Sequence, residues 1–506
     1  MASAAAVLFV KNDADDIGWW IAYHLAIGFN AVIIYDDHST DGTWDIIQNA
    51  AGLYPVEAHR ADRHAGTSHA QRRSNAFAQA MEACRTRFDW VICLDSDEYV
   101  YFDDHDDIGR YLDGFADADA IMLNWSVFGS NGHVGRPAQG PIAAYTKRAE
   151  LDFADHRAGK TFLRPGAYTG HFVDGCHFTL DPSRHVHADG TAFDPARAAS
   201  WQGARILHYV TRNLTHYTRR LARLGAGQSA PDLWSHYNRN DVQDLAAQRF
   251  RQATRQVASR LWRSSLEALY WRLQKDIKAN SLSFLPETAF TVREHRSLAM
   301  PCPLHFATLS TESGETLVYD PETHGLVPSP AASSHEQSRI VLVTEASDLS
   351  SRASQTGFLL LPPNDTAPLD SGDCLTRWIP VDITAGVPAH RDDSFTQQDE
   401  QRVTLHADGQ VMARMENGQI GFTGGTPLAL YACTFTPDTA LETRLRPYLA
   451  LRGHGNSLHD FCTGIDLLRA PQPDAMACAL ASLSNEARAV LGSRYSGFLP
   501  PWMYAA

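Results

Sequence analysis

Two aspartates separated by one small residue are the sharpest chemical signal in this sequence. Asp95, Ser96 and Asp97 follow the apolar run at 90–94, which predicts a buried strand. The two carboxylates supply hard oxygen ligands of the kind that Mn²⁺ and Mg²⁺ prefer. A metal ion held there can bridge the two phosphates of a nucleotide and stabilise the negative charge on a departing diphosphate. Because an isolated Asp-x-Asp is common, its place in the chain decides how much it means.

A second polar cluster, at 36–43, follows another apolar run, at 31–35. Asp37 and Asp41 place two more carboxylates in this turn. One interpretation is that both cap the helix that follows, because aspartate accepts hydrogen bonds from the unpaired N–H groups of a helix start. The other is that they bind a ligand, and the two roles are compatible.

Strand and helix patterns alternate along the N-terminal part of the chain. The expected strands lie at 6–10, 31–35, 56–58 and 90–94, and the expected helices at 13–27, 43–51 and 68–85. This alternation predicts an α/β fold, a parallel sheet with helices on both faces. Such sheets bind ligands at the carboxyl ends of their strands, where both acidic clusters fall. Their placement therefore favours a functional role for the two clusters over that of ordinary surface charges.

The sequence pattern changes in the second half of the chain. Residues 240–282 are helical and basic, and from about residue 300 short apolar pieces between Gly, Pro, Ser and Asp predict an all-β module. The segments 307–314 and 403–409 echo each other, which favours a trefoil-like repeat without establishing one. The expected domains are an α/β domain at 1–240, a helical connector at 241–299, a β-rich module at 300–455 and a helical tail at 456–506.

The 506 residues carry 44 Lys and Arg against 58 Asp and Glu, a formal net charge of −14. This balance argues against a general nucleic-acid binder, because phosphates need a basic partner. No apolar run of about 18 residues predicts a membrane span, and no basic segment of a secretory signal opens the chain. We therefore expect a cytoplasmic protein. Peripheral contact of the basic helix with the inner face of a membrane is a minority alternative.

Blocks of residues in the first half of the chain resemble the nucleotide-sugar half of family 2 glycosyltransferases. The turn at 35–43, Tyr-Asp-Asp-His-Ser-Thr-Asp-Gly-Thr, and the later Asp-Ser-Asp carry that resemblance. The fuller pattern is closer to glycosyltransferase family 92. Its blocks are Lys11-Asn12, Trp20 with His24, and the segments 95–99, 128–133, 160–165 and 208–212. They occur in the expected order over about residues 5–240, which is more specific than any single block.

The resemblance implies a GT-A glycosyltransferase domain that moves a hexose, expected to be galactose, from a UDP-sugar to a hydroxyl group of a glycan. It also implies inversion at the anomeric carbon, a role in polysaccharide or glycoconjugate synthesis, and dependence on Mn²⁺ or Mg²⁺. Asp37 would bind the uracil base, and Arg212 a phosphate. The expected metal ligands are Asp95, Asp97 and His208. The residues expected to bind the nucleotide sugar are Lys11, Asn12, Asp37, Asp41, Arg73, Asn75, Asp95, Ser96 and Arg212.

The catalytic base is the least determined part of the expected site. Inversion needs a carboxylate or imidazole that takes the proton of the acceptor hydroxyl. We expect Asp174 first, from its distance along the chain after Asp97, with Asp152 and His133 as the other candidates. The segment at 142–145 departs from the Glu-Arg-Phe that family members often carry there, which leaves the base and the acceptor open.

Two other classes of protein fit parts of the pattern. A non-catalytic carbohydrate-binding protein could keep a GT-A scaffold, although the intact set of Asp37, Asp95 and Asp97 argues against a decayed site. A sugar nucleotidyltransferase usually opens with a Gly-rich loop, and here the first strand leads to Lys11-Asn12-Asp13 instead. The module after residue 300 carries no motif with chemistry, so it either binds carbohydrate or serves as a structural domain.

Overall fold

The computed structural model of the chain divides into two compact units, Met1–Leu261 with Tyr495–Ala506, and Trp262–Arg494. The residues that the structure describes are 1–64, 68–137, 139–170, 172–173, 177–178, 184–223, 230–279, 305–320, 325–330, 340–344, 355–361, 377–385, 400–407, 410–415, 418–436, 458–481, 483 and 485–500.

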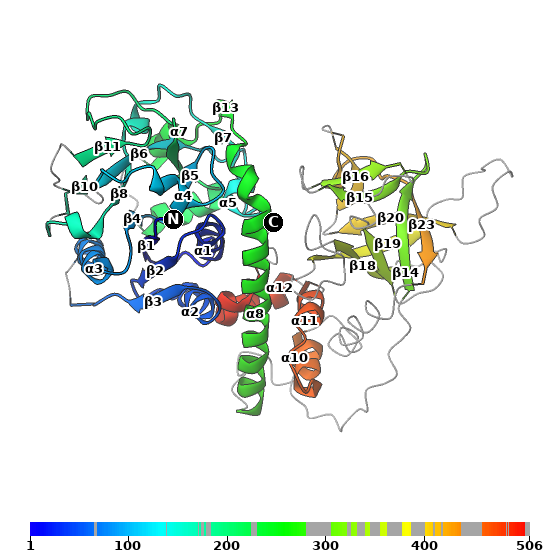
Figure 1. Cartoon of the computed structure of the whole chain (residues 1–506). Helices are drawn as coiled ribbons and strands as arrows, with labels where there is room; N and C mark the ends of the chain where they lie inside the picture. Colours follow the sequence, from blue (N-terminus) through cyan, green and yellow to red (C-terminus); the bar gives the residue numbers. More distant parts are fainter. Residues whose placement is uncertain are drawn as a thin grey trace. The chain divides into compact units, whose positions relative to one another are not determined.

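The first unit is built around one mixed sheet (Figure 1). This sheet has nine strands in the described part of the unit. Its strand order is β3-β2-β1-β4-β8-β6-β12-β5, and β11 pairs with β6. The strands β3, β2, β1 and β4 run parallel, whereas β8 is antiparallel to both of its neighbours. The bounds are β1 Ala4–Val10, β2 Ala31–Asp36, β3 Val56–Arg60, β4 Trp90–Leu94, β5 Glu98–Phe102, β6 Ala120–Val127, β8 Gly159–Leu163, β11 His185–His187 and β12 Ala204–His208.

The central strands of this sheet are buried along their whole length, because helices pack against it. On one face Phe77 and Met81 of α3 pack in a cluster with Val7 of β1 and Val91 of β4. A capping box between Ser68 and Gln71 starts α3. The helices are α1 Ile17–Ala26, α2 Thr43–Leu53, α3 His69–Cys84, α4 Ile108–Asp113, α5 Pro141–Ala144, α6 Leu214–Arg223 and α7 Ala230–Tyr237. Short strands and 3₁₀ turns complete the unit: β7 Lys147–Arg148, β9 Phe172–Val173, β10 His177–Phe178, β13 Val242–Gln243, η1 Ala154–Arg157, η2 Pro165–Ala167, η4 Ala246–Phe250 and η7 Ser496–Phe498.

We expected a wholly parallel sheet, but the sheet is mixed and curled. Only residues 95–97 separate β4 from β5, so the facing strand ends lie within about 13 Å of each other along the chain. Three strands stand between β4 and β5 in the sheet order, which in a flat sheet would separate them by about 19 Å. The sheet must therefore curl, and the curl gathers β8, β6 and β12 around the turn at 95–97.

The first helix begins later than the acidic residues before it suggested. α1 starts at Ile17, and the carbonyl of Asp13 accepts hydrogen bonds from the N–H groups of Asp16 and Ile17. Asp13 and Asp16 thus lie in the turn before the helix. Their carboxylates form ion pairs with Arg212, which ties this turn to a residue about two hundred positions later in the chain.

The second unit contains a β-domain in which every described strand pairing is antiparallel. Its strand order is β15-β16-β22-β21-β20-β19-β18-β17-β14-β23, and the pairings β15–β14 and β20–β23 close it on itself. Leu309, Leu342, Leu405 and Leu430 belong to the buried cluster of this domain. The strands are β14 His305–Thr311, β15 Thr316–Asp320, β16 Gly325–Ser329, β17 Val341–Thr344, β18 Gln355–Leu361, β19 Arg377–Ala385, β20 Glu400–Ala407, β21 Gln410–Arg414, β22 Ile420–Thr423 and β23 Leu430–Phe435.

The β-rich domain after residue 300 is present as expected, and the trefoil stays a prediction. The two echoing segments begin in β14 and β20, each of which starts a three-strand meander and pairs with β23. A trefoil needs three copies of such a repeat. Among the described strands, only β14 and β20 both start a three-strand meander and pair with β23. Within the described residues, no helix has the length and apolar character that a membrane span requires.

The division between the units falls at Leu261, whereas we placed domain boundaries at 240 and 299. The reason is α8, Arg251–Lys278, a single continuous helix that begins in the first unit and continues in the second. Three further helices, α10 Leu458–Leu467, α11 Pro473–Ala481 and α12 Asn485–Tyr495, follow the β-domain.

Candidate functional site

A polar cavity of about 380 Å³ lies at the carboxyl ends of β1 and β2. Lys11, Asp37, His38, Arg63 and Arg72 line it. Lys11 directly follows β1, Asp37 and His38 directly follow β2, and Arg72 lies on α3. Its volume falls in the range of small-molecule sites, and its three cationic side chains favour an anionic ligand.

Asp37 is the carboxylate in the lining of this cavity, and it is buried. Arg72 donates two hydrogen bonds to it, Nε to Oδ1 and Nη2 to Oδ2, each of 2.7 Å. Lys11 Nζ lies 3.3 Å from Oδ2. Burial by itself would raise the pKa of Asp37, but the hydrogen bonds from Arg72 and Lys11 hold this pKa below its ordinary value. The carboxylate is therefore ionised at neutral pH.

The turns after β1 and β2 are tied to each other by hydrogen bonds. The N–H of Asn12 donates to Ser39 Oγ, and the N–H of Thr40 donates to Asn12 Oδ1, each over 2.8 Å. Asp41 Oδ2 accepts from the N–H of Ala14 at 3.1 Å. Asn12 and Asp41, which we expected at the nucleotide sugar, therefore hold the loops that carry Lys11 and Asp37.

The turn at 95–97 places Asp95 among cations. Arg73 Nη1 donates to Oδ1 of Asp95 at 3.1 Å, and Lys160 Nζ donates to Oδ2 at 2.8 Å. The same ammonium group lies 3.0 Å from Oε2 of Glu98, whose Oε1 accepts from Trp125 Nε1 at 2.8 Å. Burial raises the pKa of Glu98, while Lys160 opposes that shift. The ammonium group of Lys160 thus lies between the carboxylate of Asp95 and the fully buried carboxylate of Glu98.

Asp97 faces a different set of partners. Its Oδ1 lies 3.7 Å from His208 Nε2, and its Oδ2 lies 3.4 Å from Arg220 Nη1. Burial would raise the pKa of Asp97, but His208 and Arg220 hold it well below its ordinary value. The chain reaches this geometry because His208 ends β12 and pairs in register with Glu98 of β5.

Asp97 and His208 fit a divalent ion. Two atoms bound to one such ion at about 2.2 Å lie between roughly 3 and 4.3 Å apart, and the 3.7 Å between Asp97 Oδ1 and His208 Nε2 is in that range. Asp95 fits less well, because both of its oxygens already bind cationic side chains. The buried Nδ1 of His208 has no hydrogen-bond partner among the described residues.

Arg212, which we expected at a phosphate, lies buried in an ion-pair network. Its Nη1 donates to Asp13 Oδ1 at 2.7 Å and to Asp16 Oδ2 at 2.8 Å, and its Nη2 donates to Ser96 Oγ at 3.2 Å. Only 2% of the residue is exposed. Arg212 and Ser96 therefore connect the turn before α1 to the turn at 95–97.

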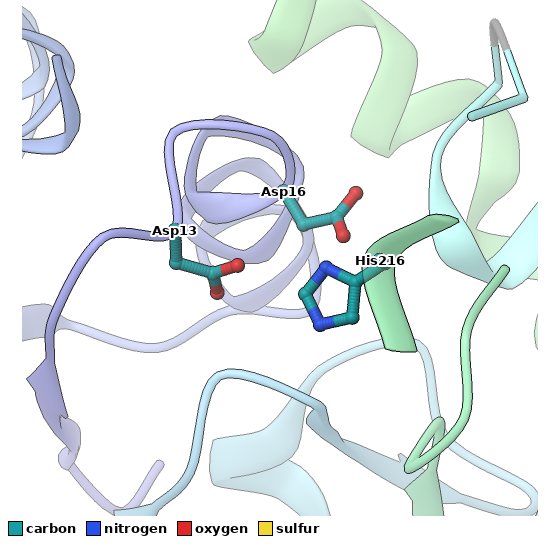
Figure 2. A group of neighbouring side chains, drawn as sticks. All are labelled: Asp13, Asp16 and His216. Atoms are coloured by element: carbon teal, nitrogen blue, oxygen red, sulfur yellow. The ribbon is translucent and has the colours of Figure 1, made fainter. Parts of the chain in front are cut away.

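In one acidic cluster the ligand atoms of three side chains lie as close together as in a metal site. Among the described residues, Asp13, Asp16 and His216 form the group of three whose ligand atoms all lie within 4.8 Å of one another (Figure 2). Burial, with the charge of Arg212, holds the pKa of His216 well below its ordinary value. Because Arg212 already forms ion pairs with both carboxylates, this ion-pair network accounts for the cluster without a metal ion. The expected ligands Asp95, Asp97 and His208 do not form so tight a group in the described structure.

The structure describes two of the three candidate bases, Asp152 and His133. Asp174 lies outside the described residues, and Asp152 is exposed in the segment before η1. His133 Nε2 donates to the carbonyl of Ala144 at 3.2 Å, so a neutral His133 presents Nδ1 as a proton acceptor. Asn75 is exposed on α3, three residues after Arg72.

Three residues that our sequence reasoning did not assign to the site contact its carboxylates. Arg72 holds Asp37, Lys160 holds Asp95, and Arg220 approaches Asp97. The consecutive Arg72 and Arg73 on α3 were a usable signal, because two neighbouring cations precede the Asp-x-Asp turn. For Arg220 we find no signal in the sequence, since α6 reaches the turn only through the tertiary fold.

The fold and the site define an α/β protein with a cationic cavity and an acidic turn at the carboxyl edge of its parallel strands. Residues 2–181 match the family model of glycosyltransferase family 92. A glycosyltransferase family 92 protein of Arabidopsis thaliana is 28% identical over 186 residues, which cover 33% of this chain and 29% of the relative. A family 92 protein of Oryza sativa subsp. japonica is 25% identical over 183 residues, 35% of this chain and 29% of the relative. The chain thus spans under a third of the length of these relatives.

Two structures of TarS from S. aureus resemble the chain weakly. TarS of S. aureus, residues 1–349 in complex with UDP-GlcNAc, matches with 13% identity and a TM-score of 0.25, over 52% of this chain and 72% of the solved chain. A second TarS 1–349 structure matches with 12% identity and a TM-score of 0.24, over 57% and 75%. These scores are too low to support an argument about fold or ligand.

Proposed function

We propose that the first unit is a glycosyltransferase that moves a hexose from a UDP-sugar to a hydroxyl group of a glycan. One observation carries the proposal: Arg72 and Arg73, neighbours on α3, bind Asp37 in the cavity and Asp95 in the Asp-x-Asp turn. A cationic cavity for a nucleotide and an acidic turn for its diphosphate end are thereby adjacent. The family 92 match over residues 2–181 supports the same activity.

In this proposal the cavity binds the UDP part of the donor. Asp37 accepts hydrogen bonds from the base, because its ionised carboxylate is an acceptor only. Lys11 and Arg63 face the phosphates, and Asn12 and Asp41 keep the surrounding loops in place. Arg212 acts at a distance, through Ser96, on the position of the Asp-x-Asp turn.

Mn²⁺ or Mg²⁺ belongs to the proposal as the ion that Asp97 and His208 would hold. When bound, such an ion stabilises the charge of the leaving diphosphate. Lys160 and Arg73 keep Asp95 ionised and directed toward the donor, where ribose is its expected partner. Inversion at the anomeric carbon and galactose as the transferred sugar rest on the resemblance to family 92 and remain proposals.

The base must take the proton of the acceptor hydroxyl as the sugar moves. Asp174 remains our first proposal, with Asp152 and His133 as alternatives. His133 has the clearest chemical argument, because its Nε2 is committed to the carbonyl of Ala144, which leaves Nδ1 free to accept a proton in the neutral ring.

UDP release across a panel of UDP-sugars, with and without Mn²⁺, tests the proposed function. We expect release with at least one donor, and a loss of at least about a hundredfold in Asp97→Ala. Asp117→Ala, which removes an exposed carboxylate, is the matched control and should retain full activity. Binding of UDP without any turnover would instead favour a carbohydrate-binding protein, and formation of pyrophosphate a sugar nucleotidyltransferase.

A further inference from the structure

The second compact unit is inserted into the first. The chain leaves the first unit at Leu261 and returns to it at Tyr495. The returning segment is well buried: Tyr495 is 1% exposed and Leu499 is 4% exposed. A segment more than two hundred residues away in sequence therefore completes the unit that carries the cavity.

The returning segment contacts the loop between β2 and α2. The hydroxyl of Ser496, the first residue of η7, donates to the carbonyl of Asp41 at 2.5 Å. Gly42 and Gly497 face each other so closely that no side chain fits between them. A Cβ on Gly497 would lie 2.5 Å from the carbonyl oxygen of Gly42 and 2.7 Å from Cβ of Asp45.

The same loop carries the cavity. Asp37 and His38 line it, and they are joined to Gly42 by only three residues. The backbone carbonyl of Asp41 binds Ser496, while its side chain binds the N–H of Ala14 in the loop after β1. The hydrogen bonds thus run from η7 through one residue to both loops of the cavity.

We infer that η7, Ser496–Phe498, is a positioning element of the proposed donor cavity, and that Gly497 sets how closely it supports the loop at 37–42. The identity of the ligand in this inference, a uridine diphosphate, rests on the proposed function. The contact between η7 and the loop does not depend on that function. η7 does not touch the ligand. It restricts the loop, so that Asp37 and His38 keep their places before the ligand arrives.

Gly497→Ala in the full chain is the test. Gly497 does not have a positive φ, so alanine adds only a methyl group in a space that has no room for it. Gly52→Ala is the matched control, because Gly52 lies on α2 and a Cβ there meets nothing within 4 Å. Ser496→Ala removes only the hydrogen bond and provides a milder variant if Gly497→Ala does not fold.

The first measurement is hydrogen exchange of the amides at 37–42, which needs no ligand. We expect exchange to become roughly tenfold faster in Gly497→Ala, to rise less in Ser496→Ala and to stay unchanged in Gly52→Ala. Unchanged exchange in both Gly497→Ala and Ser496→Ala would overturn the inference.

The second measurement is calorimetric binding of UDP to the folded variants. We expect the dissociation constant to rise roughly tenfold in Gly497→Ala and to keep its wild-type value in Gly52→Ala. If Gly497→Ala loosens the loop but binds UDP like the wild type, η7 is not a positioning element of the cavity. If the wild type does not bind UDP, the proposed function is wrong. The hydrogen-exchange result would still show whether η7 restricts the loop at 37–42.

Discussion

Arg72, on the helix that precedes the Asp-x-Asp turn, donates two parallel hydrogen bonds of 2.7 Å each to the carboxylate of Asp37. The next residue, Arg73, holds Asp95 of that turn. Because both arginines lie on α3, a change in the position of this helix moves both acidic groups together. The donor cavity and the diphosphate end of the proposed site are therefore coupled through one helix.

We predict that Asp37→Asn weakens UDP binding and destabilises the fold by about 2 kcal/mol at pH 7, because an amide cannot accept both hydrogen bonds of Arg72. The folded-state pKa of Asp37 lies below the ordinary 3.8. The stabilisation by this carboxylate is therefore complete above about pH 3.8 and is lost as the pH falls through the folded value. Urea unfolding at several pH values should show the gap between wild type and variant closing in acid. A gap independent of pH would contradict this assignment.

Lys160→Met should be strongly destabilising, by about 3–5 kcal/mol, because it leaves the buried Glu98 without its ammonium partner. The pKa of Glu98 is already raised above the ordinary 4.5 by burial. Its charge therefore opposes folding above the raised pKa, and this penalty is absent below about pH 4.5. Thermal unfolding of wild type and variant should thus differ most at neutral pH and least near pH 4.5. An equal difference at both pH values would show that Glu98 is not the group affected.

His208→Gln should weaken Mn²⁺ binding by at least about tenfold, because it removes the imidazole that faces Asp97. Calorimetry with Mn²⁺ and UDP measures this directly, without reliance on turnover. EDTA should abolish turnover by the wild type, and added Mn²⁺ should restore it. The control is His105→Gln, which changes an exposed histidine and should bind Mn²⁺ normally. Equal Mn²⁺ affinity in both variants would remove His208 from the metal site.

Arg212→Met should cost about 3–5 kcal/mol of unfolding free energy, because two buried carboxylates lose their shared partner. Adding Asp16→Asn to this variant should restore part of the loss, since it removes one of the two uncompensated charges. Arg219→Met, at a partly exposed pair with Asp15, should cost at most about 1 kcal/mol. If Arg212 instead binds a phosphate of the donor, Arg212→Met will change UDP affinity more than stability.

Several strands of the first unit, and the sheet edge at which the candidate residues Asp37 and Asp95 lie, were predictable from the sequence alone. Apolar runs followed by polar turns indicated β1, β2 and β4, and the turns after β2 and β4 do carry Asp37 and Asp95 at their carboxyl ends. These signals are local, because burial of a parallel strand requires a continuous apolar run. The β-rich character of the second half followed from equally local turn residues.

The partners of the charged side chains were decided by the tertiary structure. Arg212 has the charge to bind a phosphate, but it lies between Asp13 and Asp16, about two hundred residues away in the chain. Lys160 reaches Asp95 because β8 enters the sheet antiparallel beside β4, which strand–helix alternation does not indicate. The return of Gly497 to Gly42 is likewise invisible in sequence, since a glycine does not reveal which backbone approaches it. Spacing along the chain specifies elements, whereas a contact between distant residues depends on how the whole sheet curls and which elements it gathers.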